Sequence, residues 1–108
     1  MTWFDICSLH DLTPERGVSA LVDGRQVAVF RLTNDELFAV GNRDPFSGAN
    51  VICRGIIGTR DDAPKVASPM YKQTFDLRSG RCFEDDSIAL PTFPVRVEND
   101  RVFIAVSA

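Results

Sequence analysis

The chain has 108 residues, of which 44% are hydrophobic and 25% charged, a composition typical of one soluble globular domain over residues 1–108. Its net charge of −3 lacks the basic surplus of proteins that bind nucleic acid or anionic membranes. No apolar run approaches the roughly 20 residues of a membrane span. The first residues also lack the basic and apolar regions of a signal peptide. We therefore expect a cytoplasmic protein that binds neither nucleic acid nor membrane.

Short apolar segments separated by turn residues predict an all-β fold with little helix. In the first part of the chain the expected strands cover residues 3–7, 19–22, 26–32 and 36–40. Asp23-Gly24, between the second and third of these, is a strong hairpin signal. A single helical turn is expected to begin at Thr13 and Pro14.

The last part of the chain predicts another hairpin, in which residues 95–98 and 101–106 flank Asn99-Asp100. Between the two ends, residues 41–80 are rich in Gly, Pro, Ser, Asp and Arg and are expected to form two irregular loops. Residues 58–64 are expected to be the most mobile part. This density of turn signals predicts a β-sandwich or a small barrel.

The two central loops carry a recognisable pattern of residues. The first reads Asp44-Pro45-Phe46-Ser47-Gly48-Ala49, and the second reads Ser68-Pro69-Met70-Tyr71-Lys72-Gln73-Thr74-Phe75-Asp76 and continues to Gly80. Both resemble the cluster-binding loops of Rieske domains, which read Cys-Pro-His-x-Gly and Cys-Pro-x-His-Gly. The resemblance implies an antiparallel β-sandwich with two tip loops. Asp44 and Ser68 then stand at the cysteine positions, and Phe46 and Tyr71 at the histidine positions.

The ligands of a Rieske cluster cannot be supplied by this chain. Such a cluster needs two thiolates and two imidazoles, whereas the chain has three cysteines and one histidine. An all-cysteine cluster would need four thiolates. We therefore expect no iron–sulfur cluster and no other cofactor bound by this chain.

The chain is also similar to the small subunits of assimilatory NAD(P)H-dependent nitrite reductases (the NirD type). The stretches that carry this similarity are 46–51, 54–58, 67–73 and 90–95. The resemblance implies a subunit without a catalytic site of its own, which binds and stabilises a large subunit. That partner is expected to carry FAD, the NAD(P)H site, siroheme and an iron–sulfur cluster, and to reduce nitrite to ammonium in nitrate assimilation.

The expected partner-contact surface lies on the tip loops and consists of Asp44, Phe46, Met70, Tyr71, Lys72 and Gln73. Phe46 and Tyr71 either fill the space of the missing cluster or present an aromatic anchor to the partner. Asp44 and Ser68 are expected to cap loop amides. Basic residues near the loops could match an acidic partner surface; they are Arg43, Arg54, Arg60, Lys72 and Arg78.

Three other interpretations remain open at this point. The first is a Rieske-type ferredoxin that transfers electrons to an oxygenase or a similar redox enzyme. The second is a free-standing binding module, which would show a concave apolar pocket. The third is a structural zinc site, whose candidate ligands are Cys7, His10, Cys53 and Cys82. Their spacing lacks the paired-ligand pattern of strong zinc motifs, so buried or half-buried thiols are expected instead.

Overall fold

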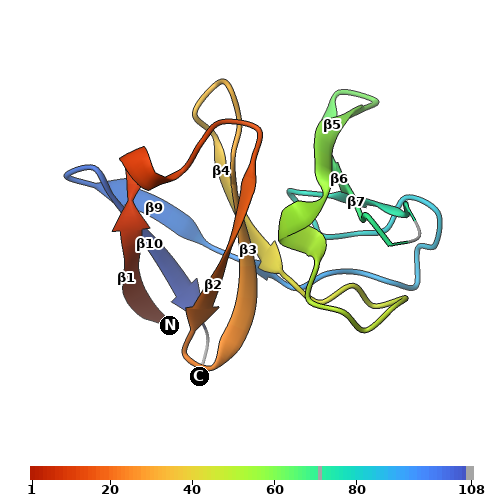
Figure 1. Cartoon of the computed structure of the whole chain (residues 1–108), viewed down its shortest axis with the longest axis horizontal. Helices are drawn as coiled ribbons and strands as arrows, with labels where there is room; N and C mark the ends of the chain where they lie inside the picture. Colours follow the sequence, from red (N-terminus) through yellow and green to blue (C-terminus); the bar gives the residue numbers. More distant parts are fainter. Residues whose placement is uncertain (71, 107–108) are drawn as a thin grey trace.

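The computed structural model describes residues 1–70 and 72–106, which form three antiparallel sheets (Figure 1). The sheets contain, in spatial order, β1 (Thr2–Ser8), β10 (Arg101–Val106) and β9 (Val95–Glu98); β2 (Gly17–Val22), β3 (Arg25–Arg31), β4 (Leu37–Gly41) and β8 (Thr92–Phe93); and β5 (Ile56–Arg60), β6 (Ala63–Ala67) and β7 (Thr74–Asp76). Two short 3-10 helices, η1 (Leu9–Asp11) and η2 (Ile52–Arg54), complete the described elements. The predicted all-β fold with little helix is confirmed. None of the described helices is long and apolar enough to cross a membrane.

Two-residue turns close three of the hairpins. Both turn residues have positive φ at 23–24, 61–62 and 99–100, as a type I′ turn requires. This turn matches the right-handed twist of the flanking strands, and Asn, Asp and Gly tolerate its backbone conformation best. The predicted hairpins around Asp23-Gly24 and Asn99-Asp100 are confirmed.

The expectation of an irregular middle segment is wrong for residues 56–67 and 74–76, which form three paired strands and a tight turn. β5 and β6 pair over five residues each and enclose Asp61-Asp62, and β7 continues the sheet. The inward face carries Ile57, Val66 and Phe75, which lie in or against one core cluster. Aspartates can adopt the positive φ that this turn needs, so Asp61-Asp62 forms the turn of a hairpin.

The expected helical turn lies earlier in the chain than predicted. The 3-10 helix η1 covers Leu9–Asp11. At the predicted position the chain makes only a turn, in which Arg16 N donates to the backbone oxygen of Thr13 at 3.2 Å. The side chain of Ser8 accepts from His10 N, and Asp11 accepts from Ser8 N at 3.1 Å, which makes a capping box. This reciprocal capping satisfies the free amides at the helix start, and therefore places the turn at Leu9.

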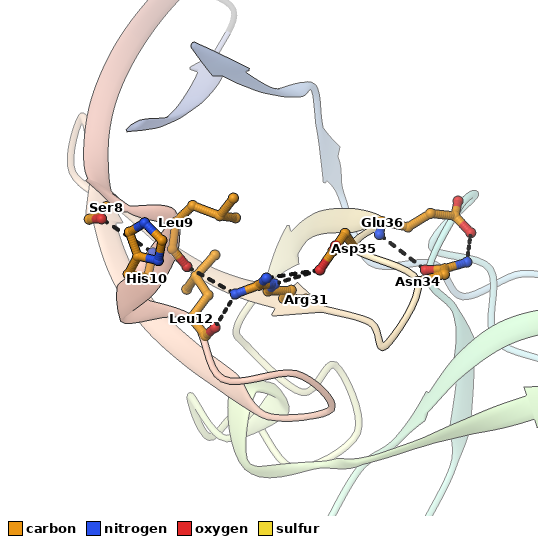
Figure 2. A network of polar contacts seen from close by, with 8 residues as sticks. All are labelled: Ser8, Leu9, His10, Leu12, Arg31, Asn34, Asp35 and Glu36. Atoms are coloured by element: carbon orange, nitrogen blue, oxygen red, sulfur yellow. Dashed lines mark hydrogen bonds and ion pairs between the residues drawn. The ribbon is translucent and has the colours of Figure 1, made fainter. Parts of the chain in front are cut away.

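The side chain of Arg31 connects the segment after β1 to the β3–β4 hairpin through hydrogen bonds (Figure 2). Its Nη1 donates to the carbonyl oxygens of Leu9 and Leu12, at 3.3 and 3.0 Å. Its Nε and Nη2 donate to Asp35 Oδ1 at 3.0 and 2.9 Å. One guanidinium group therefore satisfies two backbone carbonyls and one carboxylate, a use of its fixed fork geometry.

Two core clusters lie on the two faces of the second sheet. Val27 and Val29 belong to the cluster shared with β10, and Ala28 and Phe30 belong to the cluster shared with β6 and β7. Because neighbouring residues of a strand point to opposite faces, β3 is buried on both sides. The second sheet is thus the middle layer, and it supports the loops that follow β4 and β6.

Candidate interaction site at the tip loops

The two tip loops, residues 42–49 and 68–74, meet through a buried pair of side chains. The hydroxyl of Ser68 donates a short hydrogen bond to Asp44 Oδ2. Asp44 and Ser68 are 0% and 1% exposed. The resemblance to Rieske domains assigns these two positions to the cysteine ligands. In Rieske domains the metal cluster joins the two loops. In this chain the Ser68–Asp44 hydrogen bond, which involves a charged carboxylate, links them directly.

The carboxylate of Asp44 also organises its own loop. Its Oδ1 accepts from the amides of Phe46 and Ser47, at 2.8 and 3.4 Å. Its backbone bonds to Ala49 O at 2.8 Å and to Gly48 N at 2.7 Å. Both carboxylate oxygens are thus engaged, and the predicted capping of loop amides by Asp44 is confirmed.

Ser68 has the same function in the second loop. Its Oγ accepts from Met70 N at 3.3 Å. Its backbone oxygen accepts from Lys72 N at 3.0 Å, and its amide donates to Gln73 O at 2.9 Å. Lys72 adopts a positive φ of 63°, which closes this tight loop. The predicted capping by Ser68 is confirmed as well.

Asn42 is a structural residue of the site that sequence reasoning missed. It is 1% exposed, and its Oδ1 accepts from Cys53 N at 2.8 Å. Its backbone oxygen accepts from Ile52 N at 3.1 Å. Asn42 therefore anchors the first tip loop to η2. No motif or spacing distinguishes it from other loop asparagines, because its partners come from a segment ten residues further on.

Three apolar side chains stand exposed around the buried pair, and we call them the tip patch: Phe46, Ile56 and Met70, which are 37%, 77% and 48% exposed. Phe46 and Met70 each lie two residues beyond a member of the Asp44–Ser68 pair. Ile56 pairs with Ala67, the residue before Ser68. The Phe46 ring lies 6.4 Å from the ring of Phe75, so this side chain both packs inward and reaches solvent.

The other expected contact residues differ in accessibility. Lys72 is exposed, whereas Gln73 is half-buried and its Oε1 has no hydrogen-bond partner among the described residues. Asp44 is buried and belongs to the loop frame. Tyr71 lies outside the described residues. Sequence reasoning missed Ile56, although an isoleucine directly after Arg54-Gly55 and next to a second isoleucine was a usable signal.

The residues of the tip do not fit a Rieske cluster. The oxygens of Asp44 and Ser68 are committed to each other and to loop amides, and a phenyl ring offers no metal ligand. Across residues 1–70 and 72–106, no group of three or more His, Cys, Asp or Glu side chains is placed to hold a metal ion. The zinc ligand set of Cys7, His10, Cys53 and Cys82 is not brought together. Burial raises the pKa of the Cys7 and Cys82 thiols, which disfavours the thiolate form.

Glu84 supports the end of the second tip loop. Its Oε1 accepts from Thr74 N at 2.7 Å, and its Oε2 accepts from Thr74 Oγ1 at 2.6 Å and from Arg60 Nη1 at 2.9 Å. Partial burial by itself would raise the pKa of Glu84. The hydrogen bonds from Thr74 and Arg60 outweigh burial and lower the pKa from 4.5 to about 2.

The cross-loop bond should dominate the stability of the tip. Ser68→Ala leaves the buried carboxylate of Asp44 without one donor, so we expect the free energy of unfolding to fall by about 1–3 kcal/mol. Ser87→Ala removes a serine–aspartate bond of 2.6 Å at an exposed site and should change it by less than about 0.5 kcal/mol. Urea unfolding of both variants measures the difference, and equal effects would contradict the assignment.

Glu84 predicts an acid-dependent loss of stability. A carboxyl group whose pKa is lower in the folded state stabilises it above its unfolded pKa, and this contribution is lost as the pH falls from about 4.5 to about 2. Glu84→Gln should therefore differ most from the wild type above pH 4.5, and the two unfolding free energies should converge toward pH 2. Parallel curves for the two proteins, measured by denaturant titration at each pH, would disprove this role.

Comparison with known proteins identifies the fold and the family of this chain. Residues 2–105 match the family described as Rieske-like [2Fe-2S] domain. The nitrite reductase (NADH) small subunit of Escherichia coli K12 is 42% identical over 98 residues, which cover 90% of this chain and 91% of that protein. The NMR structure of the E. coli protein NirD superposes with a TM-score of 0.88 at 40% identity, over 95% of this chain and 94% of that one.

A further relative carries the similar segment within a longer protein. The nitrite reductase [NAD(P)H] large subunit of Klebsiella oxytoca is 39% identical over 102 residues, which cover 94% of this chain but 11% of that protein. The identity to the E. coli small subunit extends over nearly the full length of both proteins. The chain therefore belongs to the family of nitrite reductase small subunits, a Rieske-like family, and is an oxidoreductase subunit by that membership.

Proposed function

We propose that this chain is the non-catalytic small subunit of a cytoplasmic NAD(P)H-dependent nitrite reductase, and that it binds and stabilises the large subunit through its tip loops. The large subunit would carry FAD, NAD(P)H, siroheme and an iron–sulfur cluster and would reduce nitrite to ammonium. The observation that carries this proposal is the tip itself. The loops keep a fixed shape through Asp44 and Ser68, and they expose apolar side chains around that buried pair.

The exposed apolar side chains support a protein-binding role. Soluble proteins bury most large aliphatic side chains, and clusters of exposed ones at one place mark interaction surfaces. Ile56 is 77% exposed on β5, although its neighbour Ile57 packs against the core. Met70 can adapt to an irregular partner surface because its side chain is unbranched and polarizable. The tip patch therefore has the composition of a binding surface.

The fixed loop geometry supports the same role. Side chains on a rigid loop lose less conformational freedom on binding than those on a mobile one, so more of the contact energy appears as affinity. The bonds of Asp44, Ser68 and Asn42 hold both loops before any partner arrives. In this proposal the chain contributes binding and positioning, and the chemistry takes place on the large subunit.

The similar segment in the Klebsiella large subunit supports a lasting association. In that protein a domain like this one belongs to the same polypeptide as the large subunit. Thr2 and Val106 are paired across β1 and β10, and Figure 1 shows β1 and β10 well away from the third sheet. A covalent connection near these residues would therefore leave the tip loops accessible.

Reconstitution tests the proposed function directly. The purified large subunit with its cofactors should reduce nitrite with NADH or NADPH slowly or lose activity quickly when alone, and addition of this chain should restore turnover and lifetime. Rates of NAD(P)H oxidation with nitrite measure both effects. Full turnover and normal stability of the large subunit alone would reject an obligate small subunit.

Substitutions in the tip patch test where the partner binds. Ile56→Ser and Met70→Ser remove exposed apolar side chains, and we expect each to weaken binding to the large subunit by about tenfold, or about 1.4 kcal/mol. Val97→Ser is the matched control, since Val97 is 43% exposed on β9 in another sheet, and it should leave the Kd unchanged. Calorimetric titration of the large subunit measures the Kd. Equal affinities of all three variants and the wild type would place the contact elsewhere.

A further inference from the structure

A groove of about 600 Å³ lies between the first tip loop and residues of the second sheet. The start of β3, the end of β4, the first tip loop with the residue after it, and β8 with the segment before it contribute the lining. It consists of Arg25, Gln26, Gly41, Arg43, Pro45, Asn50, Ala89, Leu90, Pro91 and Phe93. Its volume lies within the range of about 300–1,000 Å³ of sites that enclose ligands. The sequence pointed to Arg43 as one of several basic residues that could match an acidic partner surface, and none of the other lining residues is an expected contact residue or belongs to the tip patch.

The charge of the groove is opposite to that of the chain. The chain has 15 acidic and 12 basic residues, yet the described lining of the groove holds neither Asp nor Glu, and Arg43 places a positive charge there. The groove between the β3–β4 turn and the β5–β6 hairpin differs, because Glu15, Glu36 and Asp62 line it together with Arg78. Charge complementarity therefore points to an acidic occupant for the groove at Arg43.

The rest of the lining is largely apolar and fixed in place. Leu90 is 3% exposed, and the backbone of Pro91 accepts from Gly41 N at 2.8 Å. Arg43 Nε donates to Gly48 O at 3.4 Å, which holds the guanidinium group against the tip loop. Leu21 lies opposite Gln26 in the β2–β3 ladder and is 68% exposed, so a large apolar side chain stands beside the groove.

The groove is continuous with the tip patch. Arg43 and Pro45 belong to the same loop as Phe46, and Pro45 is its direct neighbour in the chain. A protein that covers Phe46 therefore also reaches the mouth of the groove. This shared loop favours an occupant that is part of the protein that covers the tip.

We propose that the groove binds an extended segment of the large subunit that carries carboxylate and apolar side chains. The carboxylates face Arg43, and the apolar side chains contact Pro45, Pro91 and Leu21. This inference rests on the proposed function, since it assigns a second contact area to the same partner. It makes binding dependent on salt, because ion pairs at an interface rim are screened by added ions.

Charge reversal at the groove tests the inference in the complex with the large subunit. Arg43→Glu should weaken binding by about tenfold, and the difference from the wild type should shrink as salt is raised. Leu21→Ser should weaken binding several-fold. The matched controls are Arg16→Glu, which carries the same charge change in the exposed loop before β2, and Val97→Ser, and neither should change the Kd. Thermal unfolding of the isolated variants checks that all remain folded.

Each alternative result has a distinct meaning. If Ile56→Ser weakens binding while Arg43→Glu and Leu21→Ser do not, the groove is not part of the interface and the proposed function stands. If the wild-type chain fails to bind the large subunit, both proposals are rejected. If the isolated chain dimerises and Arg43→Glu dissociates the dimer, the occupant is a second copy. If NADH shifts the amide signals of Arg43 and Asn50 in the isolated chain, the occupant is a nucleotide. Either of the last two results overturns the inference.

Discussion

The bond between Ser68 and Asp44 is the interaction on which the rest of the tip depends. In a metal-bearing Rieske domain, iron joins the two loops through strong bonds to four side chains. Here one buried hydrogen bond to a carboxylate links them, and the remaining lone pairs of that carboxylate hold the amides of its own loop. A buried carboxylate without such donors would cost several kcal/mol, so the pair and the loop amides must be kept together.

The second sheet connects the tip loops to both hydrophobic core clusters. β3 is buried on both faces, and its alternating residues join both core clusters. Asn42 follows β4 directly and fixes the first tip loop to η2, while Glu84 fixes the end of the second loop to β5 and β7. These hydrogen bonds connect the backbone of both tip loops to the sheets.

Sequence reasoning found most of the strands and the frame of the site, and its errors have physical causes. Gly, Pro and charged residues dominate the segment around Asp61-Asp62 and favour an irregular loop, yet buried Pro64 and Val66 alternate with less buried residues along β6 as a strand requires. Capping at Ser8 placed the helical turn before Thr13, since a reciprocal pair of side-chain bonds outweighs the preference of proline for a first helical turn. The groove at Arg43 could not be predicted from the sequence, because its lining joins residues 25–26, 41–50 and 89–93, which only the tertiary packing brings together.

The sequence by itself determined the chemistry that this chain cannot perform. One histidine and three cysteines exclude a Rieske cluster by count alone, because no arrangement of the backbone supplies missing ligands. It also determined where the two loops turn, since Pro fixes φ, Gly permits positive φ and Asp caps turn amides. Only the tertiary structure decided that Asp44 and Ser68 bond to each other, that Phe46 packs on Phe75 while reaching solvent, and that Arg25 and Arg43 line one groove. These contacts join residues distant in the chain, and local preferences do not specify such pairings.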